Sequence, residues 1–385
     1  MENSNQRDTG RIELTAPKTA AISQARIPSL DGLRAVSIFM VLFAHATNTV
    51  NFPAWLIHRP SAFLVGTLGV RVFFVISGFL ITTLLLKELN KNGKISLGQF
   101  YRRRALRILP VYYFYILTVL VIFGVLGLAH MPASVYISSA TFTTHFWSHW
   151  GSESWPLQHT WSLSIEEQFY LVWPAMLAFL GPRVGGRLWV PFLIIAAPVA
   201  RCIFLNNPVV AQLFISHGDS IAVGCLLALL FTRREKETKH LLSIHPHIGR
   251  VFAVVFIYPE VFFNLPYYYI CGHDLPFKSL FPAFVPTLQN LSIGYLIGSF
   301  VSVRTGASFH FLNFGFIQWI GRLSYSLYIW QQIALMPKDY NFAPGHGSWL
   351  MWLSSFPQNI IFLIGLACLS YYCLEKPFLS LRQHK

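Results

Sequence analysis

Charged residues are scarce in this chain of 385 residues: Asp, Glu, Lys and Arg together make up 11% of it. An ordinary soluble domain carries about 25% charged residues. Hydrophobic residues reach 54% and aromatic residues 16%. With so few charges the chain could not cover its own surface in water, which excludes two or three ordinary soluble domains. The composition therefore indicates an integral membrane protein.

Patterns of cysteine and metal chemistry are also lacking. The five cysteines form no Cys-x-x-Cys pair, and most lie in apolar runs, which excludes a disulfide framework and a cysteine nucleophile: Cys202, Cys225, Cys271, Cys368 and Cys373. There is no Gly-x-Ser-x-Gly elbow and no phosphate loop of the Gly-x4-Gly-Lys type. Two groups of histidines occur without the spacing of a metal site: His245 and His247 in a basic loop, and His145, His149 and His159 in an outer region. We expect no bound metal and no resident cofactor.

The chain divides into a polar start, a long apolar body and a short end. Residues 1–27 are polar and mixed in charge, without helical periodicity, and we expect a disordered cytoplasmic tail. No small-x-small cleavage pattern follows the first apolar run, so that run is expected to be a retained membrane anchor. Residues 28–380 are predicted to form the transmembrane domain and residues 381–385 a short cytoplasmic tail.

The apolar body predicts an all-α polytopic fold, because a hydrocarbon core of about 30 Å needs roughly 20 apolar residues per helix. Ten spans are expected, near residues 33–54, 63–86, 108–128, 161–180, 188–205, 211–231, 250–265, 282–303, 315–336 and 349–373. The stretch from Ser134 to Trp147 is rich in Ser, Thr and His. We interpret it as an outer loop or an interfacial helix.

The excess of basic residues supports this count. The formal net charge is +14, from 29 Lys and Arg against 15 Asp and Glu. One alternate set of segments between the spans holds 22 of the basic residues and the other set holds 4. Because basic residues accumulate on the cytoplasmic side, this asymmetry predicts cytoplasmic N- and C-termini and an even number of spans. It also explains the basic charge without a nucleic-acid partner.

The first expected span carries ionisable residues, which are costly in a bilayer and therefore indicate function. Asp31 and Arg34 stand at its start, and His45 interrupts the apolar run that follows. Arg34 and His45 are eleven residues apart, which places them on one helix face about 16 Å apart along the axis. Such residues would meet different parts of one long ligand. The alternative is a histidine satisfied by a hydrogen bond between helices.

Two further groups follow in the third and fourth spans. Arg103, Arg104 and Arg107 cluster on one helical surface and suit a phosphate-bearing ligand, although arginines before a span also set topology. Glu166 and Glu167 lie one or two turns into a span. Facing lipid would be untenable for them, so we expect them to line a polar cavity or a buried polar network.

These residues belong to motifs that resemble the bacterial membrane acyltransferases called acyltransferase family 3. The resemblance runs over residues 27–380 in ordered strings: Leu30–Ala35 through His45, Phe73–Ile81 with Ser77, Arg103–Pro110, Trp161–Tyr170, Gly321–Trp330 with Tyr325, and Glu375–Phe378. Gln331 follows Trp330 where many relatives carry histidine. From the residues alone, Ser77-Gly78 is read as a helix-packing step.

The resemblance implies transfer of an acyl group, usually acetyl from acetyl-CoA, to a hydroxyl of a saccharide, glycolipid or small metabolite in the bacterial inner membrane. It implies that His45 is the catalytic histidine, as base or acyl carrier, with Arg34 as its companion. Arg103, Arg104 and Arg107 would bind the acyl-CoA donor. Glu166 or Glu167 would orient His45 or the acceptor. Supporting positions would be Asp31, Ser77, Trp161, Tyr325 and Glu375.

A transporter for an anionic saccharide is the rival interpretation. Ten spans, buried charges and a basic inner face would suit export of such a solute. A transporter would need no thioester and would show substrate flux. A purely structural membrane protein would leave the burial of His45, Glu166 and Glu167 unexplained.

Overall fold

The computed structural model describes residues 27–56, 59–146, 151–204, 214–233, 235–244, 249–251, 253–254 and 280–381. Within these ranges the regular structure is entirely helical. Some of the residues for which the sequence allowed predictions lie outside these ranges. They are nearly all of the N-terminal tail and of residues 381–385, most of the span 250–265, and His149, His245, His247 and Cys271.

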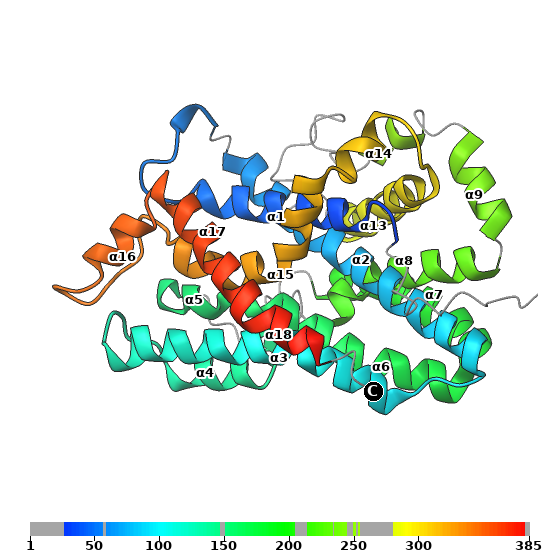
Figure 1. The fold of residues 1–385 in the computed structure, drawn as a ribbon, viewed down its shortest axis with the longest axis horizontal. Coiled ribbons are helices and arrows are strands. Elements are labelled where there is room, and N and C mark those ends of the chain that lie inside the picture. The colour runs from blue at the N-terminus through cyan, green and yellow to red at the C-terminus, as the bar shows by residue number, and fades with distance from the viewer. Residues whose placement is uncertain are drawn as a thin grey trace, which may run out of the picture.

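The described α-helices are α1 (Leu30–Ala46), α2 (Arg59–Asn92), α3 (Leu97–Val119), α4 (Ala133–Ala140), α5 (Trp155–Gln158), α6 (Thr160–Val184), α7 (Val190–Ile203), α8 (Phe214–Arg233), α9 (Glu235–Ile244), α13 (Leu280–Ser302), α14 (Ala307–Leu312), α15 (Gly315–Ala334), α16 (Ser348–Leu353), α17 (Gln358–Ser370) and α18 (Lys376–Ser380). Figure 1 shows their arrangement. Three π-helical turns, Leu120–Val125, Gly185–Trp189 and Tyr371–Glu375, continue α3, join α6 to α7 and join α17 to α18.

Five helical runs among the described residues are long and apolar enough to cross a membrane: Leu64–Asn92, Leu97–Val125, Trp155–Ile203, Ile215–Arg233 and Gln358–Ser380. The chain is thus a multi-pass membrane protein. Helices α13 and α15 nearly match the expected spans 282–303 and 315–336, and α1 overlaps the expected span 33–54 but ends already at Ala46; none of the three is among the five. Ten spans and cytoplasmic termini therefore stay predictions.

The run Trp155–Ile203 has 49 residues and contains both expected spans 161–180 and 188–205. Its direction changes at Gly181, whose backbone has φ 69° and ψ 166°. The next residue is Pro182, and the residue before a proline is driven out of the helical region. Glycine adopts a positive φ without steric cost, so the sequence breaks the helix at this point.

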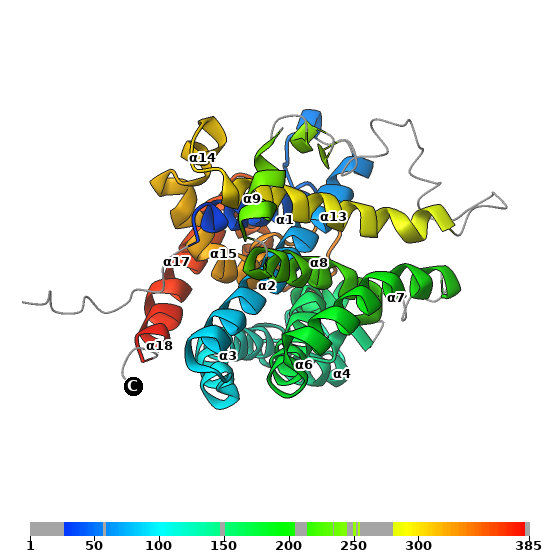
Figure 2. The same ribbon diagram turned by 90° about the vertical axis from the view of Figure 1, so that its right-hand side faces the viewer.

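Helix α2 occupies the centre of the bundle and packs against α1 and α8. Figure 2 shows α2 and α8 side by side. A Cβ atom on Gly78 would lie 2.1 Å from the carbonyl oxygen of Ile221, and one on Gly224 would lie 2.1 Å from that of Val75. The two helices can approach this closely only because both positions lack a side chain, which confirms the packing interpretation for Gly78, whereas Ser77 faces the cavity described below.

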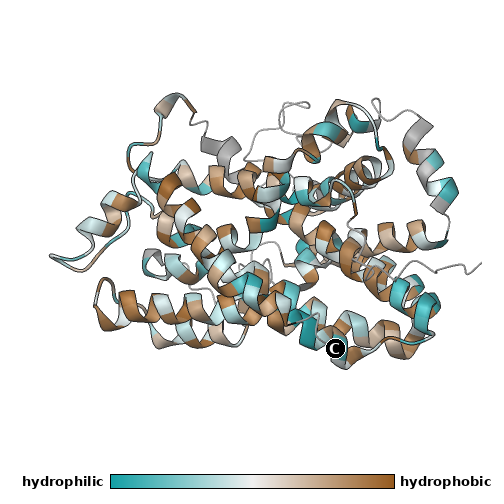
Figure 3. Cartoon of the chain, viewed as in Figure 1, coloured by the Kyte–Doolittle hydropathy of each residue, from teal (hydrophilic) through white to brown (hydrophobic). Residues whose placement is uncertain are grey.

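Some described segments that the charge count assigned to opposite faces lie at opposite ends of the molecule. In Figure 1 the short helices α4 and α16 lie at the left-hand end, whereas α9 and the turn from α2 to α3 lie at the right-hand end. Hydrophilic residues gather on α9 and at that turn, while apolar residues cover much of the helices between (Figure 3). The stretch Ser134–Trp147 contains only the short helix α4 and a 3-10 turn among its described residues, as expected of a non-spanning segment.

Replacing Gly78 by leucine should destabilise the bundle, because a side chain there meets the α8 backbone. We expect a loss of about 1–3 kcal/mol, the usual cost of overpacking, and a lower melting temperature of the detergent-solubilised protein. Gly365→Leu is the matched control, since a Cβ at this helical glycine meets no atom within 4 Å. Equal melting temperatures for both variants would contradict the close α2–α8 crossing.

Candidate active site

A cavity between α1, α2, α3, α6 and α15 brings together half of the residues singled out in the sequence. Its polar lining includes Arg34, Ser77, Arg104, Arg107, Glu166 and Tyr325. Apolar side chains such as Val70, Phe73 and Phe74 of α2 complete the wall. Residues from five helices and from distant parts of the sequence thus converge on one space.

Glu166 is fixed on one side of this cavity by hydroxyl groups. Ser77 Oγ donates to Oε1 at 2.8 Å, and Tyr170 Oη donates to Oε2 at 3.2 Å. Tyr170 lies one turn further along α6, and its one hydroxyl hydrogen is shared between Oε2 and Ser77 Oγ, which is 3.1 Å away, so the three side chains form a closed network. Each oxygen of the carboxylate therefore has a partner, which is the condition for burying it.

Three arginines line the cavity, each with an aromatic or acidic neighbour. The guanidinium of Arg104 stacks over the ring of Tyr170, 5.3 Å from its centroid. Arg107 interacts with the carboxylate of Glu375, which is 3% exposed and accepts a hydrogen bond from Ser326 at 3.1 Å. The lining itself holds the guanidinium groups of Arg34, Arg104 and Arg107 and one carboxylate, that of Glu166, while Asp31, Glu167 and Glu375 lie near the same arginines outside the lining. The guanidinium groups that face the cavity can bind an anion.

The other predicted site residues lie outside this lining. Arg103 forms an ion pair with Glu88 at 3.3 Å, and Glu88 also accepts from the backbone N–H of Ser96 at 2.8 Å. Arg103 therefore ties the end of α2 to the start of α3. Glu167 has a buried Oε1 that makes no hydrogen bond within the described part of the chain.

Two of these residues, Trp161 and Asp31, contribute to the packing of helices against each other. The ring of Trp161 lies 6.2 Å from that of Phe74 and 5.1 Å from that of His217. The backbone of Asp31 touches α15, because a Cβ on Gly321 would lie 1.9 Å from the Asp31 carbonyl oxygen. Tyr325, one turn further along α15, lines the cavity and donates to the carbonyl of Ile108 at 2.8 Å.

His45 lies beyond the cavity, at the far end of α1. Because α1 is a continuous helix over Leu30–Ala46, Arg34 and His45 are about 16 Å apart along its axis. His45 Nδ1 is 3.1 Å from Gln331 Oε1, and the Trp155 ring meets the imidazole edge-on at 5.4 Å. The observed partner of His45 is thus the amide of Gln331 on α15, whereas the sequence suggested a carboxylate.

Gln331 is therefore a site residue that the sequence did not assign. In the sequence, Gln331 stands out only as an amide beside Gln332 in a half of α15 that is otherwise mostly apolar or aromatic, and both amides are buried.

The described histidines of the outer region, His145 and His159, have different surroundings. His145 accepts a hydrogen bond from Gln168 at 3.1 Å, and burial lowers its pKa to about 4, so it stays neutral near pH 7. Of the described histidines in that group, His159 is the one that approaches His45.

Tyr328 and Ser162 connect the cavity lining with His159. Both line the cavity, and their hydroxyl oxygens are 2.5 Å apart. Tyr328 Oη also donates to the carbonyl of His159 at 3.1 Å, and its ring lies 5.4 Å from that of His159. The arginine-lined cavity and the histidines are therefore neighbours across this hydroxyl pair.

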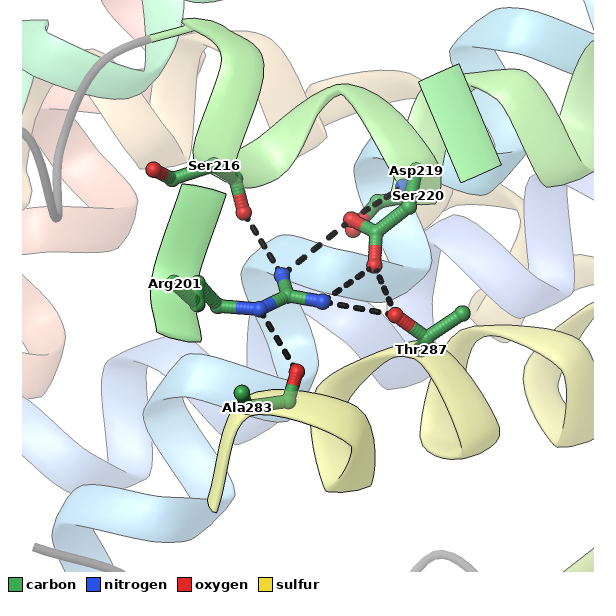
Figure 4. Close-up of polar contacts among 6 residues, drawn as sticks. All are labelled: Arg201, Ser216, Asp219, Ser220, Ala283 and Thr287. Atoms are coloured by element: carbon green, nitrogen blue, oxygen red, sulfur yellow. Dashed lines mark hydrogen bonds and ion pairs between the residues drawn. The ribbon is translucent and has the colours of Figure 1, made fainter. Parts of the chain in front are cut away.

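A second buried charge cluster belongs to the scaffold. Arg201 Nη2 lies 2.8 Å from Asp219 Oδ2, and Asp219 is fully buried. The remaining donors of Arg201 reach Ser216, Ala283 and Thr287 at 2.6–2.9 Å (Figure 4). The network joins α7, α8 and α13, and the carboxylate of Asp219 also lies near the guanidinium of Arg71 on α2.

Comparison with known proteins identifies the type of domain. The sequence model of a family described as an acyltransferase domain matches residues 27–375. The peptidoglycan O-acetyltransferase OatA of Listeria monocytogenes is 29% identical over 340 residues, which cover 81% of this chain and 50% of that protein. No solved structure matches.

Two other relatives extend the similarity. A Staphylococcus aureus protein provisionally named an O-acetyltransferase is 28% identical over 376 residues, covering 91% of this chain and 57% of that protein. Bacillus subtilis YrhL, provisionally named a peptidoglycan O-acetyltransferase, is 27% identical over 384 residues, covering 91% and 54%. The chain thus spans about half the length of these curated relatives.

Asp219→Asn should strongly destabilise the protein without touching the cavity, because it leaves the buried Arg201 charge without its counter-charge. Removing one partner of a buried pair typically costs about 3–5 kcal/mol. Thermal unfolding of the detergent-solubilised variant measures this loss, and Arg201→Met/Asp219→Leu should recover part of it. The exposed Asp339 provides the control Asp339→Asn, which should leave the melting temperature unchanged.

Proposed function

The chain belongs to the acyltransferase family whose domain it matches, and on this premise we propose that it is a membrane O-acetyltransferase. It moves an acetyl group from acetyl-CoA to a hydroxyl group of a saccharide. The observation that carries the proposal is the placement of Arg34 and His45 on one helix, with Arg104 and Arg107 beside Arg34 at the cavity. The names of the relatives support both the acetyl group and the saccharide.

The cavity suits the donor because coenzyme A is an anionic nucleotide with a long, thin arm that ends in the thioester. Guanidinium groups bind phosphate oxygens bidentately, so Arg34, Arg104 and Arg107 would hold the nucleotide end. The arm would then extend past Tyr328 and Ser162 toward His45. Acetyl-CoA is a co-substrate in this scheme and no resident cofactor is required.

His45 would act at the thioester end. Gln331 Oε1 accepts the hydrogen bond of the Nδ1–H tautomer, which leaves the Nε2 lone pair of His45 free for chemistry. Nε2 takes the proton of the acceptor hydroxyl while its oxygen attacks the thioester carbonyl carbon. The C–S bond breaks, the ester forms, and the CoA thiolate receives the proton from His45. The same lone pair could instead carry the acetyl group as an acetyl-imidazole, which is then attacked by the acceptor.

The proposed setting is the bacterial inner membrane, with the basic ends of α2, α3 and α9 in the cytoplasm, where acetyl-CoA is available. His45 would then lie toward the outer leaflet, where a cell-wall saccharide could reach it. The rival transporter would move an anionic saccharide through the bundle and would need neither CoA nor His45 as a base. Flux into proteoliposomes without consumption of acetyl-CoA would favour the transporter.

The double variant Arg104→Ala/Arg107→Ala should lose acetyl-CoA binding by about a hundredfold or more, because two charge-assisted hydrogen bonds contribute about 1.5–3 kcal/mol each. Binding of radiolabelled acetyl-CoA to the purified protein measures the change. Arg103→Ala is the matched control, since Arg103 pairs with Glu88 outside the cavity, and its affinity should stay within about threefold. Equal losses in both variants would place the donor elsewhere.

His45→Ala should bind acetyl-CoA normally but release CoA about 10²–10⁴ times more slowly, the usual contribution of a positioned base. The measurement is chromatographic detection of free CoA, with and without an acceptor saccharide. A variant that releases CoA at the wild-type rate would exclude His45 as base and as acyl carrier.

A further inference from the structure

Unsatisfied polar atoms gather around His45. His159 is 3% exposed and Gln331 is fully buried. The Nε2 of Gln331 makes no hydrogen bond within the described part of the chain, and the imidazole of His159 has no partner there apart from the backbone of Ile329. A buried polar group without a partner costs about 1–3 kcal/mol, so the Gln331 amide and the remaining ring nitrogen of His159 point to a ligand beside His45.

Aromatic rings enclose these atoms. The ring of His159 lies 5.5 Å from Tyr115 and 5.4 Å from Tyr328, and Trp155 meets His45 edge-on. The Nε1 of the buried Trp330, which packs on Tyr115 at 5.3 Å, also lacks a hydrogen-bond partner among the described residues. Rings of this kind offer apolar faces beside polar groups, which suits a molecule with both C–H faces and hydroxyl groups.

The side chains around His45 differ in charge from those of the cavity. Gln331, His159, Trp155 and Tyr328 carry no permanent charge, whereas the cavity on the other side of Tyr328 contains three arginines. An anion would gain little at the first group and much at the second. His45 is partly exposed while His159 and Gln331 are buried, so a ligand would enter past His45.

We propose that His159 and Gln331 form, beside His45, a subsite for a neutral, hydroxyl-rich acceptor, separate from the arginine-lined donor cavity. This inference rests on the proposed acetyltransferase function. One hydroxyl of the acceptor donates to His45 Nε2 and is the one acetylated. Gln331 Nε2 donates to a neighbouring oxygen, and the ring nitrogen of His159 that does not face the Ile329 backbone forms one hydrogen bond with a further hydroxyl. The acceptor thereby satisfies the atoms that lack partners.

The test uses the full-length protein in detergent with acetyl-CoA and an N-acetylglucosamine tetramer as a neutral probe. The rate of CoA release is measured against tetramer concentration for wild type, His159→Phe and Gln331→Met. The first variant keeps a ring in the aromatic cluster, and the second keeps the side-chain length. His310→Phe on the exposed side of α14 is the control. Acetyl-CoA binding is measured in parallel to verify folding.

We expect His159→Phe to raise the KM for the tetramer about tenfold while acetyl-CoA still binds, which corresponds to the loss of about one hydrogen bond. Gln331→Met should raise this KM and also lower kcat, because Gln331 orients His45. If His159→Phe fails to bind acetyl-CoA, this variant is set aside as misfolded, and the KM of Gln331→Met for the tetramer tests the subsite. An unchanged KM in the folded variants overturns the subsite.

Two further outcomes separate this inference from the proposed function. In the first, the wild-type protein binds acetyl-CoA, but a galacturonic acid trimer raises its CoA release and the tetramer does not. This result overturns the neutral acceptor and is still consistent with an acetyltransferase. Stimulation by neither saccharide, with acetyl-CoA bound, overturns the neutral subsite as well. Wild-type protein that neither binds acetyl-CoA nor releases CoA overturns the proposed function itself.

Discussion

A charge buried among apolar helices has to be neutralised, and this constraint separates the scaffold from the site. Arg201 forms an ion pair with Asp219, and the other hydrogen-bonding groups of this pair are met by α7, α8 and α13. Arg34, Arg104 and Arg107 line a cavity in which Glu166 is the one carboxylate of the lining, and the other carboxylates near them lie outside it. Guanidinium groups held in a closed network stabilise the bundle, whereas guanidinium groups that face a cavity can bind an anion. The same kind of residue thus has opposite roles in two parts of one bundle.

Helix α1 sets the distance between Arg34 at the cavity and His45. Its position is fixed by backbone contacts, at Gly321 near its start and through Ser37, which donates to the Gly69 carbonyl at 2.5 Å. Because these contacts hold the helix against both α15 and α2, Arg34 and His45 cannot shift independently. The spacing of about 16 Å between them suits a donor whose charged and reactive ends are far apart.

The sequence could predict whatever depends on local spacing. The helices, the shared face of Arg34 and His45, and the arginine cluster all follow from helical periodicity. Pairings between distant segments could not be predicted in this way. Gln331 is 286 residues from His45 along the sequence. The ion pair that holds Arg103 against Glu88, outside the cavity, depends on the turn between α2 and α3. Spacing places Arg103 and Arg104 beside each other, but packing decides which one reaches the cavity.

Tyr328 and Ser162 join two parts of the site that differ in charge. On one side three arginines and the carboxylate of Glu166 line a cavity between five helices. On the other side the partly exposed His45 contacts the Trp155 ring and the buried amide of Gln331. Under the proposed function, an acceptor bound against His45 would occupy the place from which water could attack the thioester, so binding of the acceptor itself would favour transfer over hydrolysis.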